Sequence, residues 1–171
     1  MKILPKFTAL LLVIFLLVIS TGSVLAAPKT AKVLPACSGN CLNGSWPDQT
    51  GCSSSATTVL SAYIKNGSTN IGLVELRFSS SCNTNWTRVT SYIGTSLLAG
   101  EIERNSGPDG GYLCYNNPAT PGCLGSDAFN TTTQMFTPQV YAPNNPARAT
   151  GFIATGGNTY HSCVANPPWS C

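Results

Sequence analysis

Eight cysteines constrain the fold of this chain more than any other feature of its 171 residues. An even number of cysteines in a chain with an export signal is typical of a disulfide framework. Zinc is the alternative, but its paired Cys-x-x-Cys spacings are absent and the chain has one histidine, His161. We therefore expect no metal, and four disulfides made by Cys37, Cys41, Cys52, Cys82, Cys114, Cys123, Cys163 and Cys171.

The N-terminal segment has the three parts of a cleavable signal peptide. Lys2 and Lys6 precede an apolar run over residues 9–19, and Val24 and Ala26 fit a cleavage site after Ala26. An uncleaved anchor is the alternative, but the run is shorter than the roughly 18–20 residues that cross a bilayer. We predict that residues 1–26 are removed and that the protein is secreted, either extracellular or associated with the cell wall. It would contact a membrane only through the signal peptide.

The remaining chain has the length of one ordinary domain. Removing 26 of the 171 residues leaves 145, which we divide into a flexible lead-in at 27–36 and a single disulfide-rich β domain at 37–171. Without Lys2 and Lys6, seven lysines and arginines face six acidic residues. This near-neutral balance lacks the basic surface of nucleic-acid-binding proteins. We expect a monomer that binds no nucleic acid.

Alternating apolar and polar residues predict antiparallel strands through most of the domain. A period of two, rich in β-branched residues, runs over 56–64 and 71–79, and a run over 86–93 forms a hairpin with 71–79. Further strands are predicted at 96–104, 134–141 and 147–154. No window combines the 3.6-residue period of a helix with end caps. The fold class is therefore all-β, a small disulfide-linked antiparallel barrel or sandwich.

Several segments resemble a family of exported bacterial proteins. The most specific is Val74-Glu75-Leu76-Arg77-Phe78-Ser79 followed by Cys82-Asn83-Thr84-Asn85-Trp86-Thr87-Arg88-Val89, with weaker matches within 41–59 and 135–149. Over 37–163 the chain resembles the family called domain of unknown function 2690. The resemblance implies an exported domain without an established activity. The family pattern has a cysteine after Ala147-Arg148-Ala149, where this chain has Thr150, so Cys163 needs another partner.

Sequence spacing predicts how the cysteines pair. Cys114 with Cys123 and Cys163 with Cys171 are close in sequence across turn-forming residues. Three pairings are then open to the other four cysteines. We favour Cys52 with Cys82, which would connect the start of the first strand to the tip of the hairpin. This choice leaves Cys37 with Cys41.

The motif that carries the resemblance also supplies the candidate binding residues, Glu75, Arg77, Trp86 and Arg88. Residues two apart on a strand leave the same face, so all four share one face if the hairpin places Arg77 level with Arg88. Two guanidinium groups offer forked donors to a carboxylate or phosphate, and Trp86 offers a flat surface to a sugar. We favour a structural alternative, in which Glu75 pairs with one arginine and the other stacks on Trp86. A slip of one residue would separate the arginines.

Residues suited to catalysis are scarce. The chain has no Gly-x-Ser-x-Gly motif, its cysteines are expected to be oxidised, and His161 lies close to Cys163. The segments at 48–51 and 109–111 lack the regular oxygen ligands of a calcium loop. We expect no cofactor and no catalytic residue. A glycosidase would need two carboxylates from Asp48, Glu75, Glu101, Glu103, Asp109 and Asp127.

Three functional hypotheses follow from this inventory. The leading one is a binding domain for an extracellular glycan or protein. Its contacts would include aromatic residues in loops, which are Trp46, Tyr112, Tyr115 and Trp169. The second is an inhibitor of a secreted hydrolase that uses the loop between Cys114 and Cys123. The third is a carbohydrate hydrolase centred on Glu75.

Overall fold

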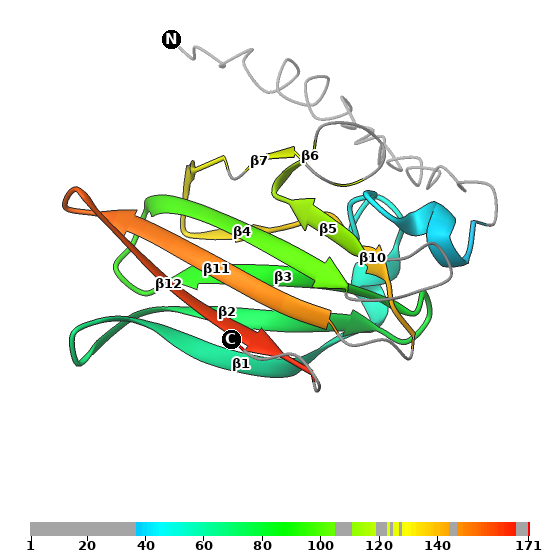
Figure 1. The fold of residues 1–171 in the computed structure, drawn as a ribbon, viewed down its shortest axis with the longest axis horizontal. Coiled ribbons are helices and arrows are strands. Elements are labelled where there is room, and N and C mark those ends of the chain that lie inside the picture. The colour runs from blue at the N-terminus through cyan, green and yellow to red at the C-terminus, as the bar shows by residue number, and fades with distance from the viewer. Residues whose placement is uncertain are drawn as a thin grey trace, which may run out of the picture. The chain divides into compact units, whose positions relative to one another are not determined.

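Two antiparallel sheets carry most of the described chain (Figure 1). The computed structural model describes residues 37–104, 111–118, 123, 125–126, 128–143, 147–166 and 171. These residues belong to one compact unit. The predicted signal peptide and lead-in lie outside the described residues, as do Asp109, Asp127 and Trp169.

The first sheet, called sheet A, is built on a three-stranded meander. Its order is β1 (Ala56–Asn66), β2 (Thr69–Ser79), β3 (Thr84–Ser91) and β10 (Val140–Tyr141), and β9 (Gln134–Phe136) also pairs with β3. A two-residue turn of Gly67 and Ser68 joins β1 to β2. Gly67 has a φ of +59°, which residues with a Cβ rarely adopt.

The second sheet, called sheet B, has the order β12 (Asn158–Ala165), β11 (Ala147–Thr155), β4 (Ser96–Arg104) and β5 (Tyr112–Tyr115). Strand β8 (Asn130–Thr132) also pairs with β4. Two short strands, β6 (Asn117–Pro118) and β7 (Gly125–Ser126), pair with each other. Two 3₁₀ turns, η2 (Gly39–Leu42) and η3 (Cys52–Ser55), precede the first strand.

The predicted strands at 56–64, 71–79, 86–93, 96–104 and 147–154 are confirmed, with small shifts at their ends. The strand predicted at 134–141 is wrong as one element, because it divides into β9 and β10. Pro138, between them, has no N–H to donate to a ladder. Thr137 N still donates to Thr87 O, but Gln139 N turns to Ser45 O. The sequence pattern does not predict β12, which pairs with β11, or the short strands β5, β6, β7 and β8.

The two sheets pack face to face as a sandwich. Val74, Leu76 and Val89 of sheet A have no exposed surface and share one core with Leu98, Ile102 and Ile153 of sheet B. Among the described strands, no hydrogen-bonded pair joins the sheets. The all-β class is therefore confirmed as a sandwich, and the closed barrel is excluded.

Gly151 on β11 permits a close approach of the two sheets. A Cβ at this position would lie 2.7 Å from Val89 Cγ2 and 3.0 Å from Val74 Cβ. Because both valines are completely buried, they have little room to move. A side chain at position 151 would push the sheets apart.

All four predicted disulfides are confirmed: Cys37–Cys41, Cys52–Cys82, Cys114–Cys123 and Cys163–Cys171. No cysteine is free. Cys52–Cys82 connects η3, just before β1, to the turn between β2 and β3. Thr150 lies directly opposite Cys163 in the β11–β12 ladder, so the cysteine of the family pattern would face Cys163 across the strands.

Candidate functional site

The four candidate residues lie together on the face of sheet A that points away from the core. Along β2 and β3 the inward side chains are Val74, Leu76 and Val89, so the alternate residues Glu75, Arg77, Trp86 and Arg88 share the opposite face. We call this surface, on β1, β2, β3 and β9, the outer face of sheet A. Glu75 and Trp86 are 5% and 3% exposed, so neighbouring side chains nearly cover both.

The register across the hairpin differs from the one supposed from the sequence. Glu75 lies opposite Arg88, and Arg77 lies opposite Trp86. Arg77 is therefore not level with Arg88, although both leave the same face. This arrangement places Arg88 beside the carboxylate of Glu75, and the two guanidinium groups stay close enough that the charge of Arg88, after burial, lowers the pKa of Arg77.

Glu75 is held by three donors. Arg88 donates from Nε to Oε2 at 2.5 Å and from Nη2 to Oε1 at 2.7 Å, and Thr58 Oγ1 donates to Oε1 at 2.7 Å. Burial by itself would raise the pKa of Glu75, but the hydrogen bonds from Arg88 and Thr58 and the charges of both arginines together lower it. The carboxylate is therefore ionised, and both of its oxygens accept hydrogen bonds.

Arg77 is held by β1. Its Nη1 donates to Thr58 Oγ1 at 2.5 Å and its Nη2 donates to the Ala56 carbonyl at 3.1 Å, while Glu75 Oε1 lies 3.9 Å from Nη1. A register shift between Thr58 and Leu60 marks a bulge in β1 next to this contact. Thr58 thus connects Arg77 to Glu75, and the structure records no stacking of Arg77 on Trp86 of the kind that the sequence suggested.

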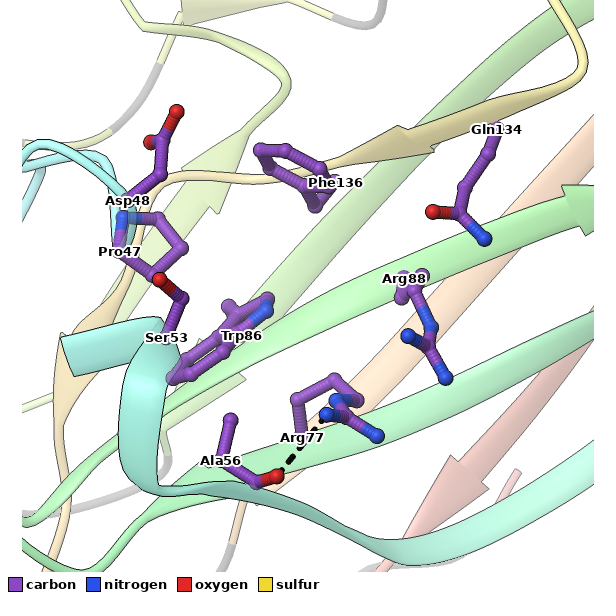
Figure 2. A pocket seen from close by; sticks show the side chains of 9 residues that line it. All are labelled: Pro47, Asp48, Ser53, Ala56, Arg77, Trp86, Arg88, Gln134 and Phe136. Atoms are coloured by element: carbon purple, nitrogen blue, oxygen red, sulfur yellow. Dashed lines mark hydrogen bonds between the residues drawn. The ribbon is translucent and has the colours of Figure 1, made fainter. Parts of the chain in front are cut away.

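A pocket of about 180 Å³ opens beside these residues (Figure 2). It brings together three separate parts of the chain: the segment before β1, the β2–β3 hairpin, and β9. Phe136 also contacts Trp46 edge to face, with the ring centroids 6.5 Å apart. The lining residues are Pro47, Asp48, Ser53, Ala56, Arg77, Trp86, Arg88, Gln134 and Phe136.

The pocket combines an aromatic wall with two cations. The side chains of Arg77 and Arg88 are 15% and 30% exposed. Glu75 neutralises one of the two positive charges. Asp48 contributes a second carboxylate, but Figure 2 shows it directed away from both guanidinium groups. An anion that enters the pocket would therefore meet unneutralised positive charge next to an indole ring.

Apart from Asp48, sequence reasoning missed the pocket residues that come from outside the hairpin. Gln134 and Phe136 carry a local signal, because they are two apart on β9 with buried Met135 between them, and so they share its outer side. The pairing of β9 with β3, which puts Phe136 opposite Arg88, is a long-range contact. Pro47 and Ser53 carry no comparable signal, since they lie in turns.

Three other residues named from the sequence lie away from the pocket. His161 packs against Phe152 on sheet B, with the ring centroids 5.9 Å apart. Glu103 forms an ion pair with Arg148 across β4 and β11. Tyr112 lies under the guanidinium of Arg104, which is 5.4 Å from the ring centroid. Within the described ranges, no three His, Cys, Asp or Glu side chains gather as metal ligands.

Comparisons with known proteins place the chain among proteins without an assigned activity. A family model described as "Protein of unknown function (DUF2690)" matches residues 40–149. The chain is 35% identical over 105 residues to the "Uncharacterized protein YjfA" of Bacillus subtilis (strain 168), a match that covers 58% of this chain and 62% of that protein. No solved structure matches the chain significantly. In the part of the chain that the structure describes, no helix is long and apolar enough to span a membrane.

Proposed function

Since this chain belongs to the DUF2690 family of proteins of unknown function, we propose its function from the geometry of the outer face of sheet A. It is a binding domain for an extracellular glycan or protein, and an anionic group of that ligand docks at Arg77 and Arg88. The domain is exported and acts as a monomer. The apolar N-terminal segment and the four disulfides, which are typical of oxidising compartments, support export.

The pocket itself is the observation that carries this proposal. Arg88 gives Nε and Nη2 to Glu75, which leaves the Nη1 edge of its guanidinium for a ligand. Thr58 and the Ala56 carbonyl already orient Arg77, so its side chain loses little conformational freedom when it binds an anion. Phe136, which is only partly buried, supplies apolar surface beside these donors, and the nearly covered Trp86 forms the floor of the pocket next to it.

The geometry favours binding over hydrolysis. A glycosidase acid needs a carboxyl group that keeps its proton near neutral pH, which requires a raised pKa. The pKa of Glu75 is lowered, and both of its oxygens accept hydrogen bonds from Arg88. The inhibitor hypothesis depends on the loop between Cys114 and Cys123, of which residues 119–122 lie outside the described residues.

The proposal is tested by following the indole signal of Trp86 by NMR in the full chain, with acetate, inorganic phosphate and galacturonate as probes. We expect at least one anion to shift this signal, and Arg88→Met to abolish the shift. The matched control is Arg148→Met, because the side chain of Arg148 is also 30% exposed and also pairs with a glutamate, but on sheet B. The proposal fails if no probe shifts the Trp86 signal, or if Arg88→Met responds like the wild type.

A further inference from the structure

A second aromatic feature lies on the outer face of sheet A, at the opposite end of the strands from Trp86. Tyr63 on β1 and Tyr92, just after β3, have ring centroids 6.4 Å apart. They are 51% and 50% exposed, which is high for large aromatic side chains. Their rings contact each other and are also open to solvent.

The strand register aligns this aromatic pair with the pocket. Three rows cross the sheet: Tyr63 with Leu73 and Thr90, then Ser61 with Glu75 and Arg88, then Thr58 with Arg77 and Trp86. Successive rows are two residues apart, so the first row is roughly 13 Å from the third. The charge of Glu75 contributes, after burial and Tyr63, to the raised pKa of Tyr92, as expected for groups on one side of the sheet.

This arrangement limits the chemistry of a ligand that spans the face. The exposed tyrosines lie at one end, Phe136 lies opposite Arg88 in the middle row, and the guanidinium groups lie beside the nearly covered ring of Trp86 at the other end. The C–H face of a pyranose ring is apolar and packs against an aromatic ring, while a carboxylate matches the forked donors of an arginine. Because the two ends are farther apart than one sugar ring, the ligand must have several units.

A peptide fits this face less well than a sugar chain. The backbone N–H and C=O groups of β2 are already paired with β1 and β3. An extended peptide laid across the face would bury its own backbone polar groups without partners, and for this reason peptides usually add to a sheet edge. A polysaccharide has no amide backbone and keeps most of its hydroxyl groups in water.

We propose that the outer face of sheet A binds a linear acidic polysaccharide, with a uronate carboxylate at Arg77 and Arg88 and another sugar unit of the same chain on Tyr63 and Tyr92. This inference rests on the proposed function and names its ligand class. The positive charge at the centre selects an acidic chain over a neutral one, and the distant aromatic pair selects a polymer over a monosaccharide.

The test is calorimetric titration of the full chain with α-1,4-linked oligogalacturonates of one, two, four and six units. The wild type should bind the hexamer at least about tenfold more tightly than the monomer, and neutral cello-oligosaccharides weakly. Replacing both tyrosines, Tyr63→Ala with Tyr92→Ala, should remove the gain with length and leave monomer binding unchanged. The control is Phe129→Ala, since Phe129 is 41% exposed and precedes β8 of sheet B.

The outcomes separate this inference from the proposed function. If small anions bind at Arg88 but affinity does not rise with oligomer length, or if the tyrosine variant binds the hexamer like the wild type, the polysaccharide inference is wrong and the pocket function stands. Poly-glutamate or poly(glycerol phosphate) that binds as tightly as the hexamer also overturns it, because neither contains a sugar ring to pack on the tyrosines.

Discussion

Glu75 and Arg88 form a cross-strand ion pair. This pair stabilises the fold and also holds Arg88 in position beside the pocket. The side chain of Glu75 is 7% exposed, whereas that of Glu103 in the comparable pair with Arg148 is 24% exposed. The carboxylate of Glu75 loses more hydration on folding than that of Glu103, so it depends more strongly on its arginine partner. The structural role of Glu75 with one arginine, favoured from the sequence, is therefore compatible with binding, because a ligand needs arginines that are already in place.

Loss of Arg88 should lower stability more than loss of Arg148. We expect Arg88→Met to reduce the free energy of unfolding by about 1–3 kcal/mol, because Glu75 is left buried with fewer donors. Arg148→Met should reduce it by less than about 1 kcal/mol, as for other partly exposed pairs. Urea unfolding of the two variants measures both values. Equal losses would contradict the stronger dependence of Glu75 on its partner.

Lowering the pH should reduce the contribution of Glu75 to the stability of the folded protein. The folded pKa of Glu75 lies below the ordinary pKa of a glutamate, so the ionised carboxylate stabilises the fold above that ordinary value, and this contribution is lost as pH falls through the lower folded pKa. The stability difference between wild type and Glu75→Gln should therefore be constant from pH 7 to pH 5 and shrink below about pH 4.5. Thr58→Val removes one donor and should move this loss to higher pH. Urea unfolding at each pH measures the differences, and a difference independent of pH would refute the assignment.

At the level of single strands, a one-residue difference in pairing decides which side chains meet on a surface. The bulge in β1 after Thr58 lies where this hydroxyl contacts both Glu75 and Arg77. On sheet B, the pairing of β11 with β12 puts Thr150 opposite Cys163, while Cys163 bonds to Cys171. The sequence showed the departure from the family pattern, but the cross-strand contact became visible only with the register.

This register predicts that the disulfide of Cys163 can be moved. Residues directly opposite each other in an antiparallel pair have Cα atoms about 4.5–5.5 Å apart, which a disulfide can bridge. In the double variant Thr150→Cys with Cys171→Ser, we expect a disulfide between positions 150 and 163 and no free thiol. Peptide mapping under non-reducing conditions identifies the bond. Two alkylated thiols at these positions would show that the β11–β12 register is different.

At the scale of the whole molecule, disulfides link the turns and the segment before β1 covalently to the strands of a small sandwich. Cys52–Cys82 closes a loop of 30 residues, whereas Cys37–Cys41 closes one of 4. Cys52 is completely buried and directly precedes Ser53, which lines the pocket. The longer bond therefore supports both the fold and the position of Pro47 and Ser53.

Removal of Cys52–Cys82 should cost more stability than removal of Cys37–Cys41. The loop-entropy relation gives about 3–4 kcal/mol for the longer loop and about 2 kcal/mol for the shorter one. Paired alanine replacements, Cys52→Ala with Cys82→Ala and Cys37→Ala with Cys41→Ala, test this by urea unfolding. Only the first pair should also weaken anion binding in the pocket. A larger loss for the second pair would contradict the assigned role of the longer bond.

The sequence by itself determined five of the strands, and it led to the disulfide pairs and, with a supposed hairpin register, to one shared face for Glu75, Arg77, Trp86 and Arg88. These properties are local or nearly so, because alternation assigns a face within a strand and sequence spacing limits disulfide loops. Only the tertiary structure decided that the sheets form an open sandwich, that Arg88 faces Glu75, and that β9 and the 47–53 segment complete the pocket. The physical reason is that register and sheet packing depend on contacts between residues far apart in the chain, which a period of two does not specify.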